Sequence, residues 1–98
     1  MIYKLIILKD AKIDLKESYK WYKKISISLG KRFENSLKDS FKIIKLNPYQ
    51  FQIRYENTRV ILIETFPYLI HFEVNDNQII IKAIIHTSRD SVVWKNRI

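Results

Sequence analysis

The chain has 98 residues, of which 18 are lysine or arginine and 10 are aspartate or glutamate, so its formal net charge at pH 7 is +8. This length fits a single domain, residues 1–98, and is too short for a second one. Because cysteine is absent, disulfide frameworks and thiolate zinc sites are excluded. No apolar run approaches the roughly 18 residues needed to span a bilayer, so the sequence predicts a cytoplasmic globular protein.

The positive charge has two possible origins. A field of this sign attracts anionic partners such as nucleic acid, an acidic protein or a membrane surface. The chain also has 13 lysines against 5 arginines, with 18 isoleucines and 6 asparagines, a bias that would equally follow from an A/T-rich coding sequence. The position of the charge in the fold therefore has to distinguish the two.

The first half of the chain predicts a strand and two helices. Residues 1–8 are apolar or aromatic on both faces except at Lys4, which favours a strand inside a sheet over one at its edge. Asp10 is positioned to cap a first helix, and Ser28 to cap a second one that ends near Leu46, before Asn47-Pro48. Both helices carry lysines on the face opposite the apolar stripe. The only glycine, Gly30, falls on the inner face of the second helix, where its missing side chain would let the two helices approach closely. The predicted core stripe of the first helix comprises Ala11, Leu15, Ser18, Tyr22 and Ile25, flanked by Tyr19 and Trp21.

The second half predicts a three-stranded antiparallel meander. Its strands are Val60–Ile63, Tyr68–Val74 and Ile79–Ile85, all rich in β-branched and aromatic residues. The last two are joined by Asn75-Asp76-Asn77, residues that tolerate the left-handed backbone of a tight turn. Pro67 belongs in the connection before the second strand, because proline cannot donate to a ladder.

The two faces of the last strand are both largely apolar, so the sequence predicts a cover over each face of the sheet. Strict alternation puts Ile79, Ile81, Ala83 and Ile85 on one face and Ile80, Lys82, Ile84 and His86 on the other. The helices would cover one face, and the chain's own tail or a partner would cover the second. The stretch Tyr49–Asn57 reads as irregular with an extended piece around Phe51–Tyr55, and Thr87–Ile98 as a short polar tail.

These elements predict an α+β fold of order βααβββ. The helical hairpin Asp10–Leu46 would pack on one face of a small, mainly antiparallel sheet formed by residues 1–8 and the three later strands. Two histidines, no cysteine and a single glycine argue against a metal site, a phosphate-binding glycine loop or any cofactor.

A group of basic and aromatic residues around the sheet is the remaining candidate for chemistry. It comprises Arg59, His71, Lys82, His86 and Arg89. Metal-free RNA cleavage needs a base, an acid and cations that neutralise the transition state, and histidine and arginine can supply these. Alternatively, the arginines bind the chain's own acids or carbonyls, and the histidines are ordinary surface residues.

Several short motifs follow one another along nearly the whole chain. They are Ala11, Asp14-Leu15, Tyr22, Leu29-Gly30-Lys31-Arg32-Phe33, Asn47-Pro48, Arg59, Phe66-Pro67-Tyr68, His86, Arg89, Trp94 and Arg97. In this order they resemble the RelE/ParE family of toxins from bacterial type II toxin–antitoxin (plasmid stabilisation) modules.

The resemblance implies a small growth-inhibiting toxin that binds a cognate antitoxin, whose C-terminal segment wraps around it. The family divides into ribosome-dependent mRNA endonucleases and ParE-type poisons of DNA gyrase. For a metal-independent endoribonuclease it implies catalysis by Arg59, His86 and Arg89; for a gyrase poison it implies target binding by Arg89, Trp94 and Arg97. The nuclease branch often has a tyrosine or histidine near its C-terminus, and His86 ends the last strand here. No tyrosine follows Tyr68, and the tail offers Trp94 instead, so a gyrase poison is favoured over an enzyme. A basic nucleic-acid-binding module without toxicity is the third interpretation.

Overall fold

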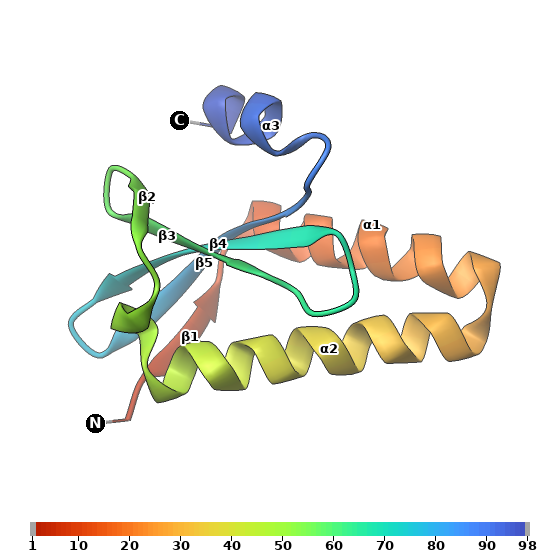
Figure 1. The fold of residues 1–98 in the computed structure, drawn as a ribbon, viewed down its shortest axis with the longest axis horizontal. Coiled ribbons are helices and arrows are strands. Elements are labelled where there is room, and N and C mark those ends of the chain that lie inside the picture. The colour runs from red at the N-terminus through yellow and green to blue at the C-terminus, as the bar shows by residue number, and fades with distance from the viewer. Residues whose placement is uncertain (1, 98) are drawn as a thin grey trace.

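The computed structural model describes residues 2–97, apart from the side chains of Trp94 and Arg97. Figure 1 shows two long helices, a five-stranded sheet and a short C-terminal helix. The elements are β1 (Lys4–Ile7), α1 (Lys9–Ile25), α2 (Ile27–Leu46), the 3-10 turn η1 (Pro48–Gln50), β2 (Ile53–Tyr55), β3 (Thr58–Leu62), β4 (Tyr68–Asn75), β5 (Gln78–His86) and α3 (Asp90–Arg97). The predicted α+β class and element order are confirmed, with β2 and α3 added.

Each helix of the hairpin has its N-cap two residues before the predicted one. Helix α1 starts at Lys9, directly after β1, and Leu8 is its N-cap without any side-chain hydrogen bond. The prediction that Asp10 caps α1 is therefore wrong; Asp10 lies in the first turn, where its charge complements the helix dipole. The cap of α2 is Ser26 rather than Ser28, because the Ser26 hydroxyl accepts the N–H of Leu29 at 3.0 Å.

The single glycine of the chain sets how closely α1 and α2 approach. A Cβ atom on Gly30 would lie 3.0 Å from both Cα and Cβ of Lys23. Only a residue without a side chain lets the two backbones meet at this point, as the position of Gly30 on the inner face of α2 predicts.

The sheet has the order β1-β5-β4-β3-β2. Strand β1 lies at the edge and runs parallel to β5, whereas the other neighbouring pairs are antiparallel. The prediction of an internal first strand is therefore wrong, whereas the prediction of a mainly antiparallel sheet is confirmed, with a parallel pairing between β1 and β5. The physical reason is that the whole helical hairpin and three further strands separate β1 from β5, a connection long enough for parallel pairing. At four residues, β1 is also short, as exposed edge strands commonly are.

The hairpin between β4 and β5 forms at the predicted turn, but its strands are not in simple register. Asp76 has the left-handed φ of 54° that the turn requires. His71 pairs with Ala83 while the next residue, Phe72, pairs with Ile81, so Lys82 is an extra residue in a β-bulge.

The bulge reverses which side chains of β5 face the helices. Ile79, Ile81 and Ile84 belong to the core under the hairpin, whereas Ala83 pairs with His71 on the opposite face. The predicted alternation, with Ile79 and Ile81 on the same face as Ala83 and Ile85, is therefore wrong beyond Lys82.

The core between the hairpin and the sheet is aromatic at its centre. Phe33 has no exposed surface, and its ring centroid lies 5.0 Å from that of Tyr22 and 5.2 Å from that of Phe66. Full burial of such a side chain contributes about 1.5–3 kcal/mol. Helix α3 lies on the other side of the strands from α2 (Figure 1) and contacts β5, so the chain's own tail covers part of the second face.

Candidate functional site

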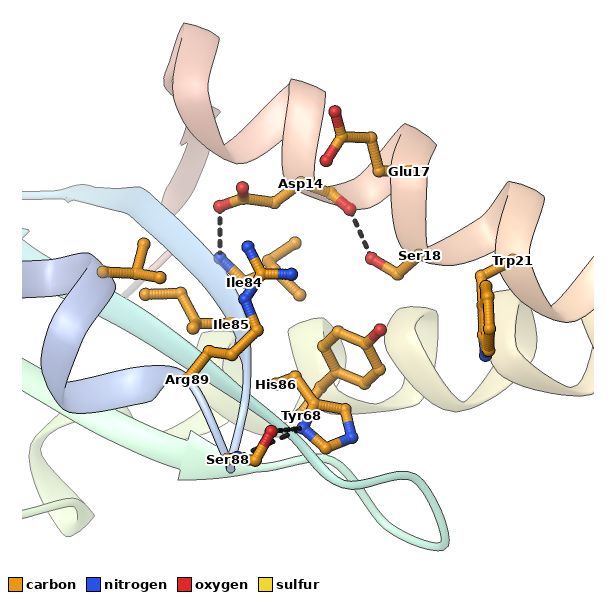
Figure 2. A pocket seen from close by; sticks show the side chains of 11 residues that line it. Asp14, Glu17, Ser18, Trp21, Tyr68, Ile84, Ile85, His86, Ser88 and Arg89 are labelled. Atoms are coloured by element: carbon orange, nitrogen blue, oxygen red, sulfur yellow. Dashed lines mark hydrogen bonds between the residues drawn. The ribbon is translucent and has the colours of Figure 1, made fainter.

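A cleft of about 440 Å³ opens between α1, the end of β5 and the start of α3. We refer to it as the α1/β5 cleft. Figure 2 shows its side chains, with α1 forming one wall and the segment from β5 to α3 the other. It is lined by Asp14, Glu17, Ser18, Trp21, Tyr68, Ile84, Ile85, His86, Ser88, Arg89 and Val93. The cleft thus brings a histidine, an arginine, two carboxylates and two large aromatic side chains together.

His86 is held in the cleft by its neighbours. The N–H of Ser88 donates to Nδ1 of His86 at 3.1 Å, and the Ser88 hydroxyl lies 2.8 Å from the same nitrogen. The ring also meets Tyr68 edge-on, with centroids 5.2 Å apart. Because Nδ1 accepts a backbone N–H, the neutral ring carries its proton on Nε2.

The Tyr68 hydroxyl lies in the cleft beside the cation of Arg89. Burial raises the pKa of the Tyr68 hydroxyl, while a hydrogen bond with Ser18 and the charge of Arg89 partly offset the increase. The hydroxyl therefore stays protonated at neutral pH.

Asp14 accepts the backbone N–H of Ile84 at 3.0 Å, which ties α1 to β5 (Figure 2).

Arg59, the third residue of the predicted catalytic group, lies elsewhere. It is opposite Phe72 on β4, whereas His86 is opposite Tyr68. These two β4 positions are four residues, or about 13 Å, apart along the strand. The Arg59 guanidinium donates to the carbonyl of Phe51 and lies 5.1 Å from the centre of the Tyr49 ring. The structure therefore brings His86 and Arg89 together and leaves Arg59 apart from them, in contact with Phe51 and Tyr49.

The residues predicted to bind a target lie at and after the same end of β5. Arg89 is exposed and immediately precedes α3, whose backbone includes Trp94 and Arg97. The side chains of Trp94 and Arg97 lie outside the described part of the chain.

A second polar group lies on the other face of the sheet, with His71 and Asp90 buried at its centre. We call Arg54, Tyr55, His71 and Asp90 the His71 network. The Nε2 atom of His71 lies 2.5 Å from Oδ1 of Asp90, and the Tyr55 hydroxyl lies 3.0 Å from Nδ1 of the same ring. Arg54 forms an ion pair with Oδ2 of Asp90 at 2.8 Å, although the contact is not aligned as a hydrogen bond. The network anchors the first residue of α3 to the middle of β4.

Burial decides the protonation of His71. The side chain has no exposed surface, and this desolvation lowers its pKa, against the opposing effect of Asp90. A neutral ring satisfies both contacts, since Nε2–H donates to Asp90 and the Tyr55 hydroxyl donates to Nδ1. Lys82, in the bulge beside the network, donates to the Thr58 hydroxyl at 2.8 Å. Two members of the predicted basic cluster, His71 and Lys82, thus make internal contacts.

The sequence interpretation missed most of the cleft wall. It assigned Trp21 and Ile25 to the core face of α1, but each is 62% exposed. Helical periodicity places Trp21 to one side of the stripe that contains Ala11. This position indicates a side chain at the margin of the core. Asp90 carried no such signal, because its role depends on a histidine 19 residues away.

Two other features are absent from residues 2–97. No three His, Cys, Asp or Glu side chains of this part gather in a way that would hold a metal ion. Nor does any of its helices combine the length and apolarity that crossing a membrane requires.

Comparison with known proteins first defines the fold. A solved structure titled "Chromosomal ParDE TA system from P. aeruginosa" matches with a TM-score of 0.70 and 20% sequence identity, covering 87% of this chain and 96% of that one. At this identity, the match shows a shared α+β fold. A comparison with curated protein sequences finds no match.

The family follows from the sequence itself. The family described as "ParE toxin of type II toxin-antitoxin system, parDE" matches residues 5–91, which include the hairpin, the sheet apart from Lys4 and the start of α3. The chain belongs to the ParE toxin family of type II toxin–antitoxin systems.

Proposed function

We propose that this protein inhibits growth by binding and poisoning DNA gyrase, and that a cognate antitoxin neutralises it. Arg89, Trp94 and Arg97 would contact the target from the end of β5 and from α3. Membership of the ParE toxin family supports this proposal, because the ParE-type branch of these toxins acts on gyrase. The residues 1–98 would act as one domain.

The single observation that carries the proposal is the separation of Arg59 from His86. A metal-free ribonuclease needs cations around the phosphate and a proton-transfer group within hydrogen-bond reach of the same atoms. Arg59 instead donates to the carbonyl of Phe51. It lies opposite Phe72 of β4, whereas His86 lies opposite Tyr68, four residues earlier in the same strand. A binding surface needs no such convergence, and Arg89 beside α3 is available for one.

A second candidate function is cleavage of mRNA at the ribosome, and a specific feature favours it. The α1/β5 cleft holds His86 and Arg89 beside the Tyr68 hydroxyl and the carboxylate of Glu17. An imidazole, a cation and a carboxylate are the groups that acid–base cleavage of RNA requires. In this alternative His86 would transfer the proton and Arg89 would stabilise the phosphate charge.

Induction of the toxin without its antitoxin separates the two functions. Supercoiling by gyrase with the DNA-damage response is followed in one arm, and transcript cuts at ribosome-occupied codons in the other. For a gyrase poison, Arg89→Gln weakens supercoiling inhibition, while His86→Ala leaves it within about twofold. For a nuclease, His86→Ala lowers cleavage by about 10²-fold or more. Rapid mRNA cutting with unaffected gyrase would contradict the proposal.

The antitoxin would be acidic and amphipathic. The net charge of +8 attracts an acidic chain, and exposed apolar side chains such as Leu62 and Ile53, 58% and 52% exposed, would hold it by burial. Co-expression with the neighbouring reading frame and purification through a tag on this chain tests the pairing. Recovery of this chain alone, with growth unaffected, would argue against an antitoxin.

A further inference from the structure

The positive charge of the protein is concentrated in its helical hairpin. Eleven of the 18 basic residues and five of the 10 acidic ones lie in α1 and α2, so these two helices carry +6 of the net +8. A biased coding sequence would enrich lysine throughout the chain, yet six of the 13 lysines lie in the 17 residues of α1. The distribution therefore requires an explanation beyond composition.

The lysines of α1 form one continuous row. All six are exposed, and at 3.6 residues per turn they fall within about 120° of arc, opposite the stripe centred on Ala11 and Ser18 that packs against the sheet. The row is about 22 Å long. It consists of Lys9, Lys12, Lys16, Lys20, Lys23 and Lys24, which we call the α1 lysine row.

No acidic side chain lies within the row. Asp14 and Glu17 face the α1/β5 cleft, and Asp10 lies on the same flank of the helix as these two. Among the described residues, no ion pair involves any lysine of the row. Like charges at i and i+4 destabilise a helix, so the row costs stability and does not serve the fold.

Helix α2 provides an internal comparison. Its outer face carries Lys31, Lys38, Lys42 and Lys45 at similar spacing, but Glu34 interrupts them and pairs with Lys38 at 3.3 Å. A surface with interspersed charges of both signs is what solubility requires. The α1 lysine row and the outer face of α2 lie on adjacent helices of similar length. They differ because only the α2 face mixes acidic side chains with its lysines.

We propose that the α1 lysine row binds the phosphate backbone of duplex DNA. The charges are arranged along a straight line, and a duplex is a linear polyanion with one charge per about 1.7 Å of its axis. A membrane surface is a poorer fit, because the apolar face of α1 is already buried against the sheet and cannot enter lipid. An acidic protein would need apolar contacts, and Ile13, 43% exposed, is the one large apolar side chain within the row.

This inference extends the proposed function, because gyrase holds duplex DNA and a toxin bound to gyrase through α3 would meet that duplex. Binding to DNA alone is measured without gyrase, so its outcome does not depend on whether gyrase is the target. A loss of DNA binding with unchanged gyrase inhibition would leave the row's ligand established and remove it from the poisoning mechanism.

The test compares two variants that lose the same charge. The first carries Lys12→Gln, Lys16→Gln, Lys20→Gln and Lys24→Gln on α1. The matched control carries Lys31→Gln, Lys38→Gln, Lys42→Gln and Lys45→Gln on α2. Glutamine is a good helix former, and circular dichroism verifies that both variants fold. A milder variant, Lys16→Gln with Lys20→Gln, covers the case in which the fourfold change disturbs α1.

Fluorescence anisotropy with a labelled 30-base-pair duplex, at several salt concentrations between about 50 and 200 mM, gives affinity and its salt slope. We expect the α1 variant to bind at least about tenfold more weakly, with a slope smaller by up to about 3.6, since each phosphate contact contributes about 0.9. The twofold variant should lose about half of that slope, and the α2 control should change affinity by less than about threefold. Equal losses on α1 and α2, a wild-type slope near zero, or tighter binding to an oligoglutamate of equal charge than to the duplex would each overturn the proposal.

Discussion

His71 and His86 lie on neighbouring strands of one sheet, yet their surroundings are opposite in kind. His71, on β4, has no exposed surface and contacts Asp90 and Tyr55 through its two ring nitrogens. His86 lies at the end of β5 and lines the α1/β5 cleft. Its Nδ1 atom contacts Ser88, two residues further along the chain. The same residue type is an anchor in one region and a candidate functional group in the other.

The difference shows that burial and the sequence distance of the partners, not residue type, separate these roles. The partners of His71 come from β2 and α3, so the His71 network joins three elements. The hydrogen-bond partner of His86, Ser88, belongs to the adjoining loop. Replacing the His86 ring should therefore leave the fold intact. Four predictions test this contrast, from the largest expected effect to the smallest.

Replacing the buried histidine should destabilise the protein most. His71→Leu removes the ring N–H that donates to the buried carboxylate of Asp90, and leaving a buried charged acceptor without its donor costs about 3 kcal/mol. Urea unfolding followed by circular dichroism measures the loss. A change below about 1 kcal/mol would mean that Arg54 alone compensates the charge.

The same histidine should make stability depend on pH. Burial lowers the pKa of His71 below its ordinary value of 6.5, so near and below that pH the unfolded chain binds a proton that the folded protein does not. The free energy of unfolding is therefore retained above about pH 7 and falls as the pH drops through 6.5 towards the lower folded pKa. The slope is at most about 1.4 kcal/mol per pH unit.

Urea titrations at about pH 7.5, 6.5 and 5.5 measure this dependence. His86→Ala is the control and should keep the decline, whereas His71→Leu should lose the part due to its own titration. Stability that rises on acidification would show that Asp90 outweighs burial.

Removing one hydroxyl from the network should have a smaller effect. Tyr55→Phe deletes the hydroxyl next to Nδ1 of His71 and keeps the ring, so the expected loss is about 1 kcal/mol. The matched control is Tyr49→Phe, because the Tyr49 side chain is exposed. Equal losses in the free energy of unfolding for the two substitutions would contradict this prediction.

The smallest effect on stability is expected in the cleft. His86→Ala removes a partly exposed ring that contacts the edge of Tyr68 and its own loop, and should cost less than about 1 kcal/mol. Thermal unfolding tests this, with His71→Leu measured alongside. A cost as large as that of His71→Leu would make His86 a structural residue and remove it from any catalytic scheme.

Several features of the protein could be predicted from short stretches of sequence. The two helices, the lysines on their outer faces, the role of Gly30 and the turn after Asn75 all follow from patterns within a few residues. Helical periodicity arises from i, i+3 and i+4 neighbours, and turn preference from the backbone angles of the residues themselves. Such local causes act before any tertiary contact forms.

Other features were decided only by tertiary structure. The bulge at Lys82 reversed the faces of β5, and the parallel pairing of β1 with β5 placed an apolar strand at the edge. Likewise, the sequence could suggest Arg59 and His86 as members of one catalytic group, but the strand register places them apart. Register and strand order depend on pairing between residues far apart in the chain, and a one-residue shift moves every later side chain to the other face. For the same reason the partnership of His71 with Asp90, 19 residues apart, emerged only when α3 docked on the sheet.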